Sequence, residues 1–336
     1  MKVVVIQENI IQPDITAEEI TSIWKTLIAF PEVTEVIVHC PEKYPSKKNL
    51  HTMIDDADAV FGLWIDKTCM SKEFLTQHPN LAYIATLGHG WEPFDVEMTK
   101  QRGLIISNTV YGAQTIAEYA FAMLMDICHN ISYHSDFVKR TNWERSKNES
   151  EFCKTQLPQI ELFNKTVGII GLGSIGYAFA KMAHGFGMHV IAYSRHKKEG
   201  SQYDFIKQVS FDTLLEQSDV ISLHTPFSAS SADMINKESI GKMKDKVILI
   251  NTARGGLIVE EDLADALNRG KIYAAGLDVL RDEPPKNDNP LLKCKNAYIT
   301  GHIAWLTRDS RFRACQMAIE NFKSYLAGKP KSIINE

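Results

Sequence analysis

Apolar and polar positions follow two different spacings along this chain. Short runs rich in Val, Ile and Leu are separated by longer stretches whose apolar residues recur at the spacing of an amphipathic helix. The short runs predict strands at residues 3–6, 34–39, 57–64, 81–87, 104–107, 166–171, 189–194, 219–224, 246–251, 273–278 and 297–300. Strands that alternate with helices are typical of βαβ units, whose strands are parallel and whose crossovers are right-handed. The pattern therefore predicts an α/β protein.

The predicted strands fall into two sets. The first set ends at residue 107 and the second begins at residue 166. Two doubly wound parallel sheets fit this division better than one sheet of eleven strands. The length of 336 residues agrees with two sheets, because a single hydrophobic core stops growing at about 250–300 residues. We expect two domains.

Three further segments, which lie outside the predicted strands, have distinctive patterns. Residues 113–130 are apolar on nearly all sides, which indicates a helix buried between domains or between subunits. Residues 132–163 are rich in charge and are expected to form an excursion over the surface. Residues 317–326 have helical spacing and are followed by Gly328 and Pro330, which are typical of a helix end.

The composition excludes several kinds of partner. Apolar residues make up 44% and charged residues 23%, which is ordinary for a globular protein. A net charge of -4 offers no basic surface for a nucleic acid or an anionic membrane. No run of about 18 apolar residues predicts a membrane span, and no signal peptide is recognised, so we expect a cytoplasmic protein. The scattered cysteines lack metal-ligand spacing, and no metal is expected; they are Cys40, Cys69, Cys128, Cys153, Cys294 and Cys315.

A glycine-rich loop directly follows the predicted strand at 166–171. Its pattern G-x-G-x-x-G places Gly171 at the turn, Gly173 at the closest approach and Gly176 in the following helix. These glycines allow a tight turn, bring the backbone up to a pyrophosphate and let helix and strand pack closely. The alternative is an ordinary tight turn in an α/β protein. Because a helix and another strand follow the loop, we expect a dinucleotide site.

The end of the next predicted strand bears on which dinucleotide is used. An acidic residue there would bind the ribose 2′-hydroxyl of NAD, but the chain has Ser194 and Arg195, followed by Lys197 and Lys198. Ser194 could donate a hydrogen bond to a 2′-phosphate, and Arg195 could bind it with both arms of the guanidinium. The residues favour NADP. NAD stays possible if Arg195 and the lysines are merely solvated.

Three later segments each end a predicted strand, where doubly wound folds bind their ligands. They read N-T-A-R-G-G at 251–256, L-D-V-L-R-D-E-P-P at 277–285 and G-H-I-A-W at 301–305. Taken singly, each has a structural explanation such as a surface ion pair or a loop acid. In this order behind the glycine loop, they resemble the D-isomer-specific 2-hydroxyacid dehydrogenase family, and most of all its glycerate dehydrogenase or hydroxypyruvate reductase branch.

The resemblance implies a hydride transfer between NAD(P)H and C2 of a small 2-oxo or 2-hydroxy acid. In this family's pattern His302 is the general acid and base, and Glu283 orients its imidazole. Arg254 would bind the substrate carboxylate and polarise the carbonyl. This chemistry agrees with what reduction of a 2-oxo acid requires. Formate dehydrogenase is a rival, but that relative pairs its histidine with glutamine rather than with a glutamate such as Glu283.

The resemblance also implies the remaining binding residues. Backbone amides of the 88–90 loop would bind the substrate carboxylate; the loop residues are Gly88, His89 and Gly90. Here the chain departs from the family's usual pattern, with Glu92-Pro93 in place of an aspartate-asparagine pair, which leaves substrate size open. Asp278 would hold the nicotinamide carboxamide, although an acid that caps a strand end is an alternative. Further cofactor contacts are expected at Ser174, Ile175, Thr225, Pro226, Thr252 and Ala253.

The family's architecture predicts the domain boundaries. Residues 1–107 and 301–336 would form a flavodoxin-like substrate domain, and 108–300 an inserted Rossmann cofactor domain. The helix at 113–130 resembles the family's dimer-forming element, so we expect a homodimer. A non-enzymatic alternative is a dinucleotide-sensing assembly protein, like the corepressors that resemble this family. The chain lacks an extended disordered tail for recruitment, and its Trp305 context resembles the enzymes.

Overall fold

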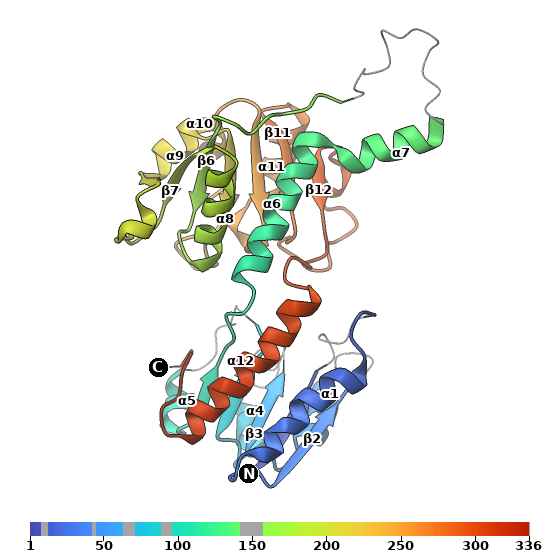
Figure 1. Cartoon of the computed structure of the whole chain (residues 1–336), viewed down its shortest axis with the longest axis vertical. Coiled ribbons are helices and arrows are strands. Elements are labelled where there is room, and N and C mark those ends of the chain that lie inside the picture. Colours follow the sequence, from blue (N-terminus) through green and yellow to red (C-terminus); the bar gives the residue numbers. More distant parts are fainter. Residues whose placement is uncertain (8–12, 42–44, 63–70, 89–95, 142–156, 336) are drawn as a thin grey trace. The chain divides into compact units, whose positions relative to one another are not determined.

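The computed structural model describes residues 1–7, 13–41, 45–62, 71–88, 96–141 and 157–335. The chain divides into two compact units: unit 1 is Met1–Gly112 with Leu306–Glu336, and unit 2 is Ala113–Trp305 (Figure 1). Each of the two boundaries between the units lies five residues after the boundary predicted from the sequence. The second boundary lies later because hydrogen bonds to Leu277 and Asp278, at the end of a unit 2 strand, hold residues 300–304.

Unit 1 contains a five-stranded parallel sheet in the order β2-β1-β3-β4-β5. This is the flavodoxin-like order, in which the strand sequence reverses between β1 and β3. The strands are β1 (Lys2–Ile6), β2 (Glu35–His39), β3 (Ala59–Gly62), β4 (Tyr83–Thr86) and β5 (Ile105–Ser107). Five of the sequence-predicted strands correspond to these elements, with ends that differ by a few residues.

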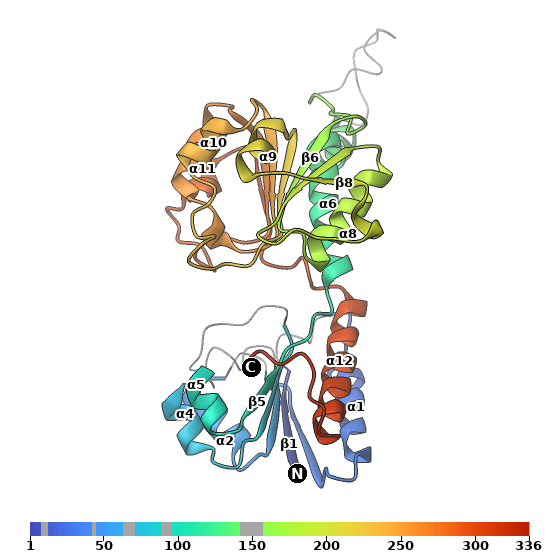
Figure 2. The same ribbon diagram turned by 90° about the vertical axis from the view of Figure 1, so that its left-hand side faces the viewer.

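Helices cover both faces of the unit 1 sheet (Figure 2). Alternate residues of β1 divide between two cores, because successive strand side chains point to opposite faces. Val3 and Val5 pack with α1 (Ala17–Lys25) and α12 (Arg308–Leu326). Val4 and Ile6 pack with the helices of the other face, which are α2 (Lys47–Ile54) and α4 (Lys72–Gln77). A further helix, α5 (Val96–Gln101), precedes β5.

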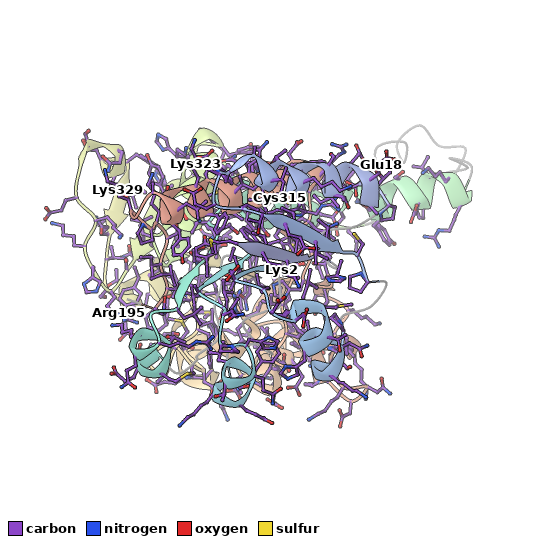
Figure 3. All side chains as sticks on the ribbon, turned by 90° about the horizontal axis from the view of Figure 1, so that it is seen from below. Lys2, Glu18, Arg195, Cys315, Lys323 and Lys329 are labelled. Carbon is purple, nitrogen blue, oxygen red and sulfur yellow. The ribbon has the colours of Figure 1, made fainter. Side chains whose placement is uncertain are left out.

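The C-terminal helix is longer than its sequence pattern predicts. It begins at Arg308 rather than at residue 317, and the side chain of Thr307 caps it by accepting a hydrogen bond from the Ser310 amide. Its first half carries Arg311, which is 1% exposed and donates to both carboxylate oxygens of Asp14. Figure 3 shows Cys315 on the helix side that faces the strands, where burial raises the pKa of its thiol to about 12.

Unit 2 contains a seven-stranded parallel sheet in the order β12-β11-β10-β9-β6-β7-β8. This order is that of a Rossmann sheet extended by one strand, and it reverses between β6 and β9. The strands are β6 (Thr166–Ile170), β7 (His189–Tyr193), β8 (Ile206–Gln208), β9 (Val220–Leu223), β10 (Val247–Asn251), β11 (Ile272–Leu277) and β12 (Ala297–Ile299). The α/β fold with two doubly wound sheets is thus confirmed.

Helices also cover both faces of the unit 2 sheet. The long helix α6 (Ala113–His129) and α8 (Ser174–Gly185) form one core with β6 and β7. The opposite face is covered by α9 (Phe211–Gln217), α10 (Lys237–Lys242) and α11 (Glu260–Asn268). Short 3-10 helices lie at η4 (Ser201–Tyr203), η5 (Gly255–Leu257) and η6 (Pro290–Lys293), and in unit 1 at η2 (Thr26–Ala29).

Two elements of unit 2 add detail to the prediction. Residues 132–163 are expected to form an excursion over the surface, and the chain begins this region as helix α7 (Ile131–Thr141), most of whose described side chains are exposed. The short edge strand β8 is absent from the prediction because Ile206 is its only apolar residue. Within the parts of the chain that the structure describes, no helix is long and apolar enough to cross a membrane.

Candidate active site

The predicted site residues of unit 2 gather at the carboxyl ends of its strands, where doubly wound folds bind ligands. The glycine loop follows β6, and its two neighbours in the sheet are β7 and β9. Ser194 and Arg195 follow β7, and Thr225 and Pro226 follow β9. The remaining groups follow β10, β11 and β12 in turn; they are Thr252, Ala253, Arg254, Asp278, Glu283 and His302.

Two glycines of the loop are required by the fold itself. Gly171 has φ 99°, in the left-handed region, and a Cβ there would lie 2.6 Å from the carbonyl oxygen of His224. A Cβ on Gly176 would lie 2.1 Å from the carbonyl oxygen of Gly171. The first glycine therefore permits the strand-to-helix turn, and the second lets α8 approach the end of β6.

Gly173 has a different environment. It is the N-cap of α8, no side chain caps the helix there, and a Cβ on it would meet no atom within 4 Å. The N-terminus of α8, which begins with Ser174 and Ile175, is thus open for an anion. A second observation lies after β10, where the hydroxyl of Thr252 is buried without a hydrogen-bond partner among the described residues. Both features fit a bound dinucleotide.

The loop after β7 is fixed at both ends. At its far end, the side chain of Gln208 accepts from the Lys198 amide at 2.8 Å and donates to its carbonyl at 2.7 Å. Arg195 is exposed (Figure 3) and donates to the hydroxyl of Ser230 at 3.0 Å. Ser230 belongs to the segment that follows Thr225 and Pro226. The structure therefore brings together the segments that follow β7 and β9, both of which contain predicted cofactor contacts. No acidic residue occupies positions 194–198.

His302 and Glu283 form a hydrogen-bonded pair. Nδ1 of His302 lies 2.7 Å from Oε2 of Glu283, and the two side chains are 35% and 39% exposed. The other carboxylate oxygen of Glu283 accepts from the Leu280 amide at 3.1 Å. Burial raises the pKa of Glu283, but the hydrogen bond and charge of His302, the Leu280 amide and the charge of Arg254 together hold the pKa below its ordinary value. Glu283 therefore stays a carboxylate that accepts a hydrogen bond from the Nδ1–H group of His302.

The loop that carries Arg254 touches the loop that carries Glu283. A Cβ on Gly255 would lie 1.9 Å from the carbonyl carbon of Leu280, so only glycine allows this approach. The side chain of Asn251 supports Arg254 by donating to its carbonyl at 2.9 Å. The positive charge of Arg254 also contributes to the lowered pKa of Glu283. Arg254, Glu283 and His302 thus lie together in unit 2.

Asp278 holds the segment that contains His302. Its carboxylate is 1% exposed and accepts hydrogen bonds from the Thr300 hydroxyl at 2.6 Å and from the amides of Ile303 and Ala304 at 3.0 and 2.8 Å. Its carbonyl accepts from the His302 amide at 2.8 Å. Asp278 therefore has a structural role at this strand end. The nicotinamide contact that the resemblance implies stays a prediction.

The expected substrate loop lies largely outside the described residues. His89 and Gly90 belong to the undescribed range, whereas Gly88 follows β4 and its carbonyl accepts from the Thr109 amide at 3.3 Å. Across the described ranges, no group of three His, Cys, Asp or Glu side chains could hold a metal ion.

One supporting residue has no signal in the sequence. Glu260, at the start of α11, is 8% exposed and accepts from the Arg281 amide and from the side chain of Asn289, both at 2.8 Å. It thereby fixes both ends of the loop that contains Glu283. Glu260 resembles any acidic residue in the first turn of a helix, and only the fold reveals its partners 21 and 29 residues away.

Comparisons with known proteins show which family the chain is similar to. Residues 121–304 match the family model described as D-isomer specific 2-hydroxyacid dehydrogenase, NAD binding domain. The chain is 40% identical over 314 residues to a hydroxypyruvate reductase of Blautia hydrogenotrophica, covering 93% of this chain and 95% of that protein. It is 35% identical over 298 residues to a glyoxylate reductase of Thermococcus litoralis, covering 88% of each.

Solved structures share the fold of nearly the whole chain. An acyclic imino acid reductase in complex with NADPH and D-Arg has a TM-score of 0.80 at 29% identity, covering 99% of this chain and 100% of that one. The D-lactate dehydrogenase of Aquifex aeolicus, complexed with NAD and lactic acid, has a TM-score of 0.78 at 27% identity, covering 99% of each chain.

Proposed function

Because the chain belongs to the D-isomer-specific 2-hydroxyacid dehydrogenase family, we propose that Arg254, Glu283 and His302 catalyse its hydride-transfer reaction. The protein is a nicotinamide-dependent oxidoreductase of small 2-oxo and 2-hydroxy acids of the glyoxylate and hydroxypyruvate type. The observation that carries the residue assignment is the 2.7 Å bond between His302 and Glu283 beside Arg254.

A nicotinamide dinucleotide supplies or accepts the hydride when it is bound. In the reducing direction His302 donates a proton to the carbonyl oxygen of the substrate. Since the Glu283 carboxylate only accepts hydrogen bonds, it requires a proton on Nδ1 of His302, which leaves Nε2 to exchange the catalytic proton. In the oxidising direction Nε2 accepts the proton from the substrate hydroxyl. Glu283 orients the ring in both directions.

Arg254 would bind the substrate carboxylate. Its planar guanidinium can donate two parallel hydrogen bonds to one carboxylate, which fixes the orientation of C2 as well as the position of the substrate. Its positive charge also stabilises the negative charge that builds up on the carbonyl oxygen as the hydride arrives at C2. The amides of 88–90 are proposed as a second carboxylate site, on the strength of the family resemblance.

NADP is the proposed cofactor, with NAD as the alternative. Ser194 and Arg195 lie where a carboxylate would select NAD. The loop after β7, which Gln208 fixes at Lys198, keeps them at the end of that strand. The pyrophosphate would bind the open N-terminus of α8, and the adenosine would lie between the segments that follow β7 and β9. Thr252, Ala253 and Asp278 are proposed to line the nicotinamide side.

Initial rates with a panel of 2-oxo acids and both cofactors test the proposal. We expect turnover of glyoxylate and hydroxypyruvate, and a kcat/KM with NADPH that exceeds the value with NADH. A clear preference for NADH would refute the role of Ser194 and Arg195. Failure to turn over any 2-oxo acid with either cofactor would refute the assignment of the catalytic residues and favour the assembly-protein alternative.

A homodimer is also proposed. The family resemblance of α6 supports it, as do exposed apolar side chains at the start of α7, where Ile131 is 63% and Tyr133 42% exposed. Light scattering coupled to size-exclusion chromatography tests the mass, and a monomer at micromolar concentration would contradict the proposal. A cytoplasmic location stays a prediction from sequence.

A further inference from the structure

His302 has a backbone conformation that is unusual for its residue type. Its φ is 57°, in the left-handed region where residues with a Cβ are uncommon. Such a conformation persists only where the surroundings impose it, and it is often found at functional sites. The groups that impose it on His302 therefore also determine where its imidazole lies.

Two bonds hold the backbone of His302 from opposite sides. On one side, its amide donates to the carbonyl of Asp278 at 2.8 Å. On the other, its carbonyl accepts a hydrogen bond from Nε1 of Trp305 at 3.0 Å. The 302–303 peptide itself is held on its N–H side, because the Ile303 amide donates to the Asp278 carboxylate at 3.0 Å. The indole N–H binds the carbonyl of the same peptide and so completes its fixation.

We propose that Trp305 is a positioning residue for the proton donor. Its indole N–H holds the carbonyl of His302, maintains the left-handed backbone and thereby keeps Nδ1 within hydrogen-bond distance of Glu283. The inference rests on the proposed roles of His302 and Glu283. Tryptophan suits this task because a rigid ring with two side-chain torsions presents a single N–H donor at little entropic cost.

The position of Glu283 is fixed independently of Trp305. The Leu280 amide binds one oxygen of the carboxylate, and Glu260 fixes both ends of the loop. If the indole bond were lost, the 302–303 peptide would keep only its bond to Asp278, and the imidazole could shift while its partner stayed in place. The pair would then lengthen or break, so the effect of losing the indole N–H should pass through the His302–Glu283 bond.

The substitution Trp305→Phe keeps an aromatic ring and removes the N–H. We expect kcat to fall about three- to tenfold, as for the loss of one orienting hydrogen bond, with the dinucleotide Kd unchanged within about twofold. Trp24→Phe is the matched control. Trp24 is buried in unit 1, and its indole N–H has no partner among the described residues, so this variant loses ring volume without losing a bond. Its kcat should equal that of the wild type.

Two further measurements separate positioning from a general structural effect. In a double-mutant cycle with Glu283→Gln, the two losses of kcat should be less than additive, because both act on the same bond. The Nδ1–H proton resonance of His302, observed by NMR, should broaden through faster exchange with water in Trp305→Phe, because the Nδ1 proton loses its carboxylate acceptor.

The possible outcomes distinguish this inference from the proposed function. An unchanged Nδ1–H resonance, a kcat within twofold of wild type, or fully additive losses in a folded variant would overturn the role of Trp305. If the wild type turned over no 2-oxo acid, the proposed function would fail. The NMR measurement of the Nδ1–H resonance would still decide whether Trp305 holds His302 against Glu283, because it needs no substrate.

Discussion

The substitution Gly173→Ala is predicted to separate dinucleotide binding from folding. The backbone of Gly173 has φ -86° and ψ -165°, which alanine adopts readily, and a Cβ there meets no atom within 4 Å. Alanine is a poorer N-cap than glycine by a few tenths of a kcal/mol or more, but it lowers the entropy of the unfolded chain by about 0.4–1 kcal/mol. The free energy of unfolding should therefore change by less than about 1 kcal/mol.

The same methyl group should severely weaken cofactor binding. The added carbon would occupy the open space at the N-terminus of α8 in which the pyrophosphate is proposed to lie. Loss of two hydrogen bonds from backbone amides to a charged group costs about 1.5–3 kcal/mol each, or about 3–6 kcal/mol together. Since about 1.4 kcal/mol corresponds to a tenfold change in Kd, we expect dinucleotide binding to weaken by at least about 100-fold.

Gly176→Ala provides the contrasting variant. Its Cβ would lie 2.1 Å from the Gly171 carbonyl oxygen and 3.2 Å from Cγ2 of Ile169, so α8 must shift away from β6. Overpacking of this kind costs about 1–3 kcal/mol of stability. Urea unfolding and fluorescence titration with NADPH would measure both quantities in both variants. Binding to Gly173→Ala within threefold of wild type, or equal destabilisation of the two variants, would refute this account of the loop.

Three further predictions concern single side chains. His302→Ala should lower kcat about 10²–10⁴-fold in steady-state assays while the dinucleotide Kd stays unchanged, and a loss below tenfold would argue against acid–base catalysis. Arg254→Lys should raise the substrate KM at least tenfold, since lysine cannot make the paired bonds; an unchanged KM would place Arg254 outside the substrate site. Burial lowers the pKa of His224 from 6.5 to about 3. On acidification the unfolded state therefore takes up a proton that the folded state does not bind. The free energy of unfolding should be highest above pH 6.5 and decline as the pH falls towards 3. At about 1.36 kcal/mol per pH unit, this amounts to about 2 kcal/mol between pH 6.5 and 5; urea unfolding of His224→Gln should show a correspondingly smaller pH dependence, and an identical one would contradict the assignment.

The buried parallel strands were predictable because their side chains are apolar on both faces. Val3 to Ile6 are all buried, and a run of this kind has few alternatives once helices flank it. The start of α12 was not predictable, because Arg308, Asp309 and Arg311 give it a polar appearance. Arg311 is nevertheless buried, since Asp14, 297 residues away, pairs with it. Only tertiary structure brings that partner to the helix.

The sequence offers candidates for the chemistry of the site more readily than for its support. Arg254, Glu283 and His302 are proposed from short motifs, because each reaction step needs a particular type of side chain. The contacts that support these residues cannot be found in this way. The three bonds from 300–304 to the Asp278 carboxylate and the buried Glu260 depend on which loops meet beyond the sheet. The local spacing of residue types in the sequence does not show which loops come into contact.

The later domain boundary has a consequence for specificity. Because the Asp278 carboxylate binds the segment at 300–304, His302 belongs to unit 2 together with the glycine loop, Arg254 and Glu283. The geometry of the proposed proton donor and of the proposed cofactor site is thus set within one unit. Residues 88–90, which the sequence assigns to the substrate, belong to unit 1. Substitutions at 88–90 should therefore change the order of KM values among 2-oxo acids while the bond between His302 and Glu283, and the pH dependence of kcat that follows from it, stay as in the wild type.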